Sequence, residues 1–247
     1  MYEMNVLTEG ILPSIAIRGI APFPHTDLRI EIGRNVSKRA LLEAERNYDS
    51  HVLLLIQENP MHDNPTETNV LNHGVIAKIG IKIKLPNGNF KVKFDPIIRA
   101  ELLQFQQTDP YFITRFKTMP TVQEDIDQEL ALVRMLAKQV VDNSKTLLKN
   151  PKLSLDAIQR GVSSDKLCDI VAFNLKTAES LKFKYIETAS LNQRLTYLLE
   201  DIEKEKYMNQ IENDINMTVK KNIDENQKEY YLREKMRAIQ EELGDKV

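Results

Sequence analysis

The sequence predicts an α+β fold in which a β-rich N-terminal region precedes a helical region and a long C-terminal helix. Aliphatic residues alternate with lysine and glycine over residues 75–85, which is the period of a strand with one buried face. From residue 124 onward, apolar residues recur every three or four positions, which is the helical period. Residues 162–243 contain neither glycine nor proline, the two residues least favourable inside a helix.

The N-terminal region, residues 1–117, carries the strand signals. Its clearest element is a hairpin, in which the turn Pro-Asn-Gly-Asn at residues 86–89 separates the alternating run from a second one. In this second run Phe90, Val92 and Phe94 alternate with lysine, so we expect one face of the hairpin to be buried. One helix is predicted at residues 37–46, and shorter strands are predicted at residues 14–17, 28–32, 52–56, 100–105 and 111–116.

The helical region, residues 118–189, begins where the apolar period changes. Short helices are predicted up to residue 188, with breaks near Pro151 and at Gly161, which we expect to end a helix. The first of these helices is amphipathic, and its predicted apolar face consists of Ile126, Leu130, Val133, Ala137 and Val140.

Residues 190–247 are predicted to form one long helix with two apolar stripes. The charged sequence Glu-Lys-Glu-Lys at residues 203–206 separates the stripes. Their spacing changes from alternating four and three to uniform four, which rotates the apolar face around the helix. We therefore expect the two ends to face different partners, with the second end either solvated or self-associating. The stripes are Leu191, Leu195, Leu198 and Ile202, followed by Ile211, Ile215, Val219 and Ile223.

Composition argues against several classes of protein. A net charge of −2 over 247 residues gives no general attraction to nucleic acid or anionic lipid. Cys168 is the single cysteine and can form no internal disulfide. No apolar run approaches the roughly 18 residues that a membrane helix needs, and residues 1–10 lack the pattern of a secretory leader. The prediction is a cytoplasmic protein without a membrane segment.

No catalytic constellation is evident in the sequence. The phosphate-binding pattern Gly-x-x-x-x-Gly-Lys-Ser/Thr is absent, and the histidines are not spaced as a pair of metal ligands on one helix. Ser163 and Lys166 fit a Ser-x-x-Lys pattern, but the companion motifs of the serine acyl enzymes are missing. Ser163 is therefore interpreted as a helix cap, and we predict no catalytic, cofactor-binding or metal-binding residue.

The lysines of the hairpin suggest an alternative function in nucleic-acid binding. Strict alternation would place five of them on one face, where they could contact phosphates: Lys78, Lys82, Lys84, Lys91 and Lys93. Phe90 and Phe94 would then point to the opposite face, which leaves no aromatic platform for stacking bases. The competing interpretation is a solvated, charged face that resists aggregation.

Several segments resemble the N-terminal region of the Lon family of ATP-dependent proteases. Residues 227–244, QKEYYLREKMRAIQEELG, are similar to the segment that precedes the ATPase module in that family. Residues 12–24, LPSIAIRGIAPFP, are similar to the family's opening pattern, and HGVIAKI with KLPNGNFKV resembles its hairpin. The resemblance covers nearly the whole chain, and Gly19 and His25 depart from the residues usual at their positions.

The resemblance implies a PUA-like β domain at residues 1–117, a helical domain at 118–189 and a long helix at 190–247. In the family this helix leads to an AAA+ ATPase, which uses ATP and magnesium, and to a Ser-Lys peptidase, neither of which these residues include. The implied role is non-catalytic capture of unfolded or degron-bearing polypeptides and assembly of a hexamer. A purely structural role in oligomerisation is a third hypothesis.

Capture of unfolded polypeptides requires apolar side chains that the fold leaves accessible. Two segments, one before the second predicted strand and one at the hairpin tip, supply the candidates: Ile20, Pro22, Phe23, Pro24, Leu85, Pro86 and Phe90. The competing interpretation is that Phe23 and Leu85 cap the β core.

Overall fold

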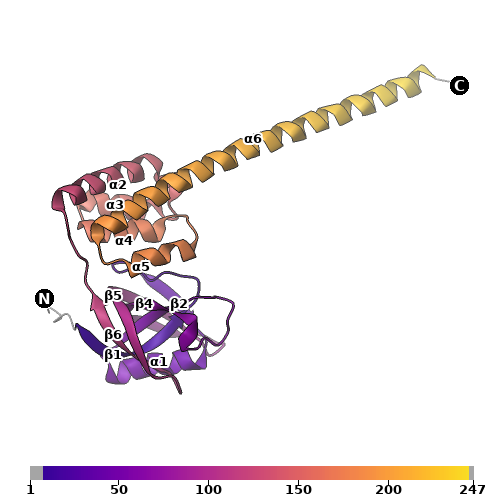
Figure 1. The fold of residues 1–247 in the computed structure, drawn as a ribbon. Coiled ribbons are helices and arrows are strands. Elements are labelled where there is room, and N and C mark those ends of the chain that lie inside the picture. Colours follow the sequence, from indigo (N-terminus) through magenta and orange to yellow (C-terminus); the bar gives the residue numbers. More distant parts are fainter. Residues whose placement is uncertain (1–7, 245–247) are drawn as a thin grey trace. The chain divides into compact units, whose positions relative to one another are not determined.

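The chain divides into two units, Met1–Ile202 and Glu203–Val247. The computed structural model describes residues 8–244, whose helices and strands are labelled in Figure 1. The prediction that residues 1–10 form no secretory leader falls largely on positions 1–7, which lie outside the described residues. Within residues 8–244, no helix is both long enough and apolar enough to cross a bilayer.

A small β-barrel forms the first part of the first unit. The strand order β2-β5-β4-β3-β1-β6, with a further pairing of β5 and β6, closes five strands into a ring and leaves β2 on the flank of β5. β1 and β3 are parallel, and the remaining pairs are antiparallel. The strands are β1 (Glu9–Ile17), β2 (Leu28–Ile32), β3 (His51–Gln57), β4 (Val70–Lys84), β5 (Phe90–Gln107) and β6 (Phe112–Met119).

The strands contribute to two apolar clusters, one on each face. Successive side chains of a strand point to opposite faces. β3 therefore places Leu53 and Leu55 in one cluster, and Val52 and Leu54 in the other. Its uninterrupted aliphatic sequence reflects this burial on both sides. Helix α1 (Asn35–Asn47), which follows β2 in the chain, packs its Leu41 into the second cluster.

Within residues 8–244, the helical part of the first unit consists of four α-helices and the first turns of a fifth. Asp125 caps the first of them by accepting a hydrogen bond from the Gln128 amide at 2.9 Å. Pro151 occupies the first turn of α3, and Gly161, with a φ of 61°, ends it in the left-handed conformation. The helices are α2 (Ile126–Leu147), α3 (Pro151–Arg160), α4 (Ser164–Asn174), α5 (Phe183–Glu187) and α6 (Leu191–Leu243).

A buried ion-pair cluster joins the barrel to the helices. Arg99 of β5 donates two hydrogen bonds to the carboxylate of Asp169 in α4, at 2.5 and 3.2 Å. It donates a third to the Tyr185 carbonyl at 2.7 Å. Arg194 of α6 donates to the same carboxylate at 3.0 Å. Burial and the neighbouring Arg99 lower the pKa of Arg194, while Asp169 opposes this shift. One carboxylate thus fixes a strand and two helices to each other.

The described part of the second unit consists almost entirely of α6 beyond Ile202. Ile215, Val219 and Ile223 of the second apolar stripe are exposed, at 56, 49 and 50%. The first stripe, from Leu191 to Ile202, is fully buried at 0%. The structure therefore confirms one long helix whose two stripes have different environments.

The predicted α+β fold is confirmed, and several details differ. Residues 100–105 are the continuation of β5 and not a separate strand, because that strand pairs first with β2 and then with β6. β1 begins at Glu9, five positions before the predicted start at residue 14. The predicted apolar face of α2 is displaced, since Ile126 and Leu130 are 69 and 48% exposed. Its buried apolar residues are Leu136, Val140 and Leu147.

Candidate functional site

The predicted contacts before β2 are mostly inaccessible. Phe23 is 0% exposed, and its ring centroid lies 6.0 Å from that of Tyr185 and 6.3 Å from that of Phe173. Pro22 and Pro24 are buried beside it. Phe23 therefore packs against the helices and not as a cap on the β core alone, and it offers no free surface to a polypeptide. Ile20, at the start of this segment, is half-buried.

The predicted contacts at the hairpin tip are more accessible. Pro86 is exposed, and Leu85 and Phe90 are half-buried. The turn is held by hydrogen bonds from the Leu85 amide to the Asn89 carbonyl at 2.8 Å and from the Gly88 amide to the Leu85 carbonyl at 2.9 Å. These bonds fix the tip and keep its apolar side chains in place.

A β-bulge in β4 changes which side chains the hairpin exposes. Ile79 lies opposite Phe94, but Lys82 lies opposite Val92, so three steps on β4 match two on β5. The extra residue exchanges the two faces beyond Ile79. Ile81 and Ile83, predicted to be buried, are consequently 65 and 54% exposed.

The sequence prediction names Leu85, Pro86 and Phe90 of this hairpin but misses Ile81 and Ile83, although one signal marks the bulge. Gly80 interrupts an otherwise regular strand pattern, and an isolated glycine in a strand often accompanies a bulge. We call Ile81, Ile83, Leu85 and Pro86 the hairpin patch.

The bulge also overturns the predicted row of five lysines. Lys82 and Lys84 lie opposite Val92 and Phe90, so they share a face with these two residues. Lys82 pairs with Glu45 of α1, and its Nζ lies 5.2 Å from the centroid of the Phe90 ring. These two lysines therefore lie on the face toward α1.

The other three lysines lie on the opposite face of the hairpin. Lys91 lies opposite Ile83, and Lys78 lies opposite Asp95. The Nζ of Lys93 is 3.0 Å from Asp95 and 3.1 Å from Asp27, and hydrogen bonds to these carboxylates raise the pKa of this lysine. The phosphate-binding row that strict alternation would produce is not formed.

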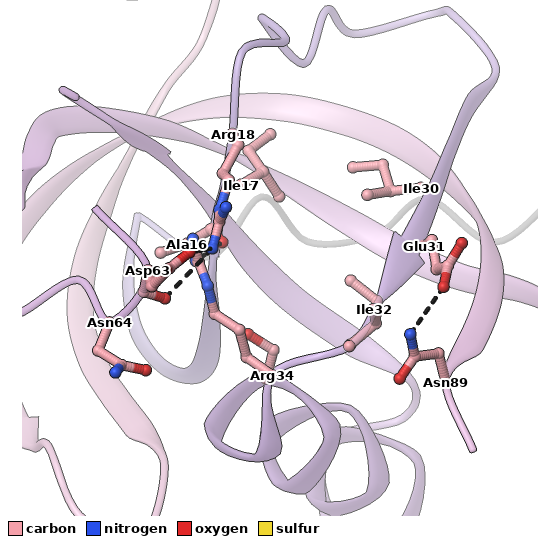
Figure 2. Close-up of a pocket in the computed structure, with 12 residues that line it drawn as sticks. Ala16, Ile17, Arg18, Ile30, Glu31, Ile32, Arg34, Asp63, Asn64 and Asn89 are labelled. Carbon is pink, nitrogen blue, oxygen red and sulfur yellow. Dashed lines mark hydrogen bonds and ion pairs between the residues drawn. The ribbon is translucent and has the colours of Figure 1, made fainter. Parts of the chain in front are cut away.

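A cavity of about 520 Å³ lies between β1, β2 and the start of α1. Figure 2 shows Ala16, Ile17 and Arg18 on one side, with Ile30, Glu31 and Ile32 on the other. Asp63, from the loop that follows β3, also lines it. Asn64 of the same loop and Asn89 of the hairpin turn complete the rim.

Charged side chains of the cavity are held by specific partners. Arg18 pairs with Asp63 at 3.0 Å, and Arg34 donates to the Ala16 carbonyl at 3.1 Å and to Gln57 Oε1 at 2.7 Å. Burial, followed by the charge of Arg18, lowers the pKa of Arg34.

Glu31, on the other rim of this cavity, is held by the hairpin turn. It accepts hydrogen bonds from the side-chain amides of Asn89, at 2.7 Å, and Asn87, at 3.2 Å. These bonds lower the pKa of its carboxyl group. The cavity is thus lined by apolar side chains, among them Ile17, Ile30 and Ile32, together with polar groups that hydrogen bonds hold in place.

The other candidate catalytic groups, Ser163 and Cys168, have structural roles. Ser163 precedes α4 as its cap residue but makes no capping hydrogen bond, since its hydroxyl donates to Asp165 at 2.6 Å. Cys168 is fully buried, and burial raises the pKa of its thiol to about 12, which disfavours the reactive thiolate. Within residues 8–244, no three His, Cys, Asp or Glu side chains are grouped to hold a metal ion.

Comparison with known sequences identifies similar proteins. Residues 11–204 match the family model described as the ATP-dependent protease La (LON) substrate-binding domain. The chain is 40% identical to a Lon protease of Aster yellows witches'-broom phytoplasma over 237 residues, which is 96% of this chain and 30% of that protein. It is 31% identical to Lon protease 1 of Bacillus subtilis over 235 residues, 95% of this chain and 30% of that protein. The chain thus spans about 30% of the length of these relatives.

Solved structures share the fold. The N-terminal domain of the Mycobacterium avium complex Lon protease matches with a TM-score of 0.63 at 16% identity, over 78% of this chain and 98% of that one. A Lon N-terminal domain protein from Xanthomonas campestris matches with a TM-score of 0.52 at 10% identity, over 77% of this chain and 98% of that one. At these identities the likeness concerns the fold alone.

Proposed function

Because the chain belongs to the family of Lon substrate-binding domains, we propose that it captures unfolded or degron-bearing polypeptides for a Lon-type ATP-dependent protease. In this proposal residues 1–117 bind the substrate, residues 118–189 support them, and residues 190–247 lead toward an ATPase module that uses ATP and magnesium. A Ser-Lys peptidase module would cleave the substrate. The complete protein would act as a cytoplasmic hexamer, and these residues would carry no catalytic step.

The observation that carries the proposal is the hairpin patch. Ile81 and Ile83 are 65 and 54% exposed on a strand that a fixed turn holds in place. Unfolded polypeptides expose apolar side chains that folded proteins bury. An ordered apolar surface of this kind therefore binds unfolded polypeptides in preference to folded ones. Each contact would be weak, and several copies in an oligomer would raise the overall affinity through avidity.

The test compares two double variants of the 247-residue chain. Ile81→Ser with Ile83→Ser removes the centre of the patch, and Ile126→Ser with Leu130→Ser removes apolar side chains of comparable exposure from α2. Binding is measured by the fluorescence anisotropy of a labelled, permanently unfolded polypeptide, with its folded form as the control. We expect the hairpin variant to bind about tenfold more weakly and the α2 variant to bind like the wild type.

Three outcomes decide the interpretation. Both variants should unfold at the temperature of the wild type, because the replaced side chains are exposed. Equal affinity of the hairpin variant and the wild type would remove the patch from the binding site. A steep loss of binding with salt would indicate a charged surface instead of an apolar one.

A further inference from the structure

The strands β1 and β2 follow each other in the chain but do not pair. β1 pairs with β3 over residues 14–17, whereas its ladder with β6 ends at Ser14. β2 pairs with β5 on one side, and no strand of the described sheet lies on its other side. Each strand therefore presents a backbone edge without a strand partner, and the cavity of about 520 Å³ lies between these two edges (Figure 2).

The backbone at these edges carries unused hydrogen-bonding capacity. Alternate residues of a strand direct their amide and carbonyl groups to opposite sides, so a strand with one neighbour leaves half of them facing outward. At the β1 edge the Ala16 carbonyl accepts a hydrogen bond from Arg34 Nη1 at 3.1 Å. An arginine side chain here occupies the place of a strand amide. The β2 edge, at Ile30, Glu31 and Ile32, has no corresponding partner among the described residues.

The cavity also adjoins the surface assigned above to substrate. Asn89, which lines it, belongs to the turn that carries Pro86 of the hairpin patch. Along its other edge, β2 pairs with residues 90–94 of the same hairpin. A polypeptide bound at the hairpin patch can therefore continue into the cavity without leaving the surface of the barrel.

We propose that the cavity accepts an extended segment of the substrate polypeptide as an added β-strand, hydrogen-bonded to the edge of β2. This inference rests on the proposed function and specifies its chemistry. At about 3.3 Å per residue, the three edge positions of β2 accommodate a short segment of roughly three to five residues. Main-chain pairing tolerates many side chains, and only an unfolded or extended segment exposes its backbone for it. The site would thus distinguish extended from folded polypeptides more strongly than it would distinguish one amino-acid sequence from another.

The first arm of the test alters the probe. A labelled, unfolded peptide is compared with two versions of itself in which alternate backbone amides are N-methylated, one in each register. Side chains are unchanged, but one version loses the amides that face β2. We expect that version to bind the wild-type chain on the order of tenfold more weakly than the unmodified peptide. Equal affinity of all three peptides would overturn the added-strand mode.

The second arm alters the protein. Asn64 is exposed and lines the cavity, so Asn64→Trp places an indole in the path of the added strand. Met61 is 84% exposed in the same loop and does not line the cavity, so Met61→Trp is the matched control. We expect Asn64→Trp to weaken binding on the order of tenfold and Met61→Trp to leave it unchanged.

The two arms separate failure of this inference from failure of the proposed function. If Asn64→Trp binds like the wild type while the hairpin-patch variant loses binding, the chain captures substrate but not as an added strand. If the wild type binds no unfolded polypeptide at all, both the proposed function and the added-strand mode are overturned.

Discussion

Helix α6 contains two stretches that look alike in sequence and differ completely in environment. Leu191, Leu195 and Leu198 are 0% exposed, whereas Ile215, Val219 and Ile223 are 49–56% exposed. Both stretches repeat aliphatic residues on one helical face. An apolar stripe in the sequence therefore predicts a helix, but it does not predict burial. Burial of the stripe depends on which other segments of the chain pack against it.

The polar contacts of the two stretches differ in the same way. In the first, Asp201 accepts hydrogen bonds from the Tyr185 hydroxyl and from Lys184, both at 2.7 Å. In the second, Arg233 and Glu229 form an exposed pair one helical turn apart, at 2.5 Å. Pairs of this kind contribute only about 0.3–0.5 kcal/mol. The first stretch is therefore fixed by long-range contacts, and the second by the helix itself.

Removing the shared carboxylate should produce the largest effect. Asp169→Asn leaves the buried Arg99 and Arg194 without a counter-charge, which should lower the free energy of unfolding by about 3–5 kcal/mol. Urea denaturation followed by circular dichroism measures this change. Glu229→Gln in the exposed stretch is the matched control and should cost less than about 0.5 kcal/mol. A loss below about 1 kcal/mol for Asp169→Asn would show that the cluster does not hold the first stretch.

Truncating the buried stripe should have the next largest effect. Leu198 is fully buried, so Leu198→Ala creates a cavity and should cost about 3 kcal/mol within a range of 2–5 kcal/mol. The measurement is again the free energy of unfolding in urea. An unchanged value would mean that this helical face is not packed in solution.

The buried region should also give the protein an alkaline pH dependence. Burial lowers the pKa of Lys182 from 10.5 to about 8, against the attraction of Glu179. Between these two pH values the unfolded chain binds more protons than the folded chain, so the free energy of unfolding should rise with pH. The rise from this group is at most about 3 kcal/mol.

The matched variant for this effect is Lys182→Met. The difference in unfolding free energy between the wild type and this variant isolates the lysine, because other groups titrate in both proteins. It should grow in favour of the wild type from about pH 8 to about pH 10.5. A difference independent of pH would contradict the lowered pKa.

The smallest effect is expected in the exposed stripe. Ile223 is 50% exposed, so Ile223→Ala should change the free energy of unfolding by no more than about 0.5 kcal/mol. Alanine is also the better helix former, which offsets any lost contact. A cost comparable to that of Leu198→Ala would show that a partner covers this stripe in solution.

Much of the fold could be predicted because its signals are local. β2 matches its predicted residues 28–32, and Pro151 and Gly161 bound α3 as their backbone preferences require. The hairpin lies at its predicted residues, but the prediction of which side chains share each face is wrong beyond Ile79. Alternation is counted along one strand, whereas the bulge between Ile79 and Lys82 arises from pairing with β5.

The candidate site was less predictable because distant segments build it. The sequence left open whether Phe23 is an accessible contact or caps the β core. Phe173 and Tyr185, at least 150 positions away along the chain, pack against it in the structure. The cavity brings together Ala16, Arg34 and Asn64 from three different segments, and no motif links them. An unpaired strand edge becomes visible only when the strand order is known.

The most direct test of the account is hydrogen–deuterium exchange of the 247-residue chain with and without an unfolded polypeptide. We predict slower exchange in β2 and in the hairpin of residues 80–90, with no change in the exposed stretch of α6 over residues 203–242. Protection confined to residues 203–242, or none anywhere, would contradict the claim that the barrel captures the substrate.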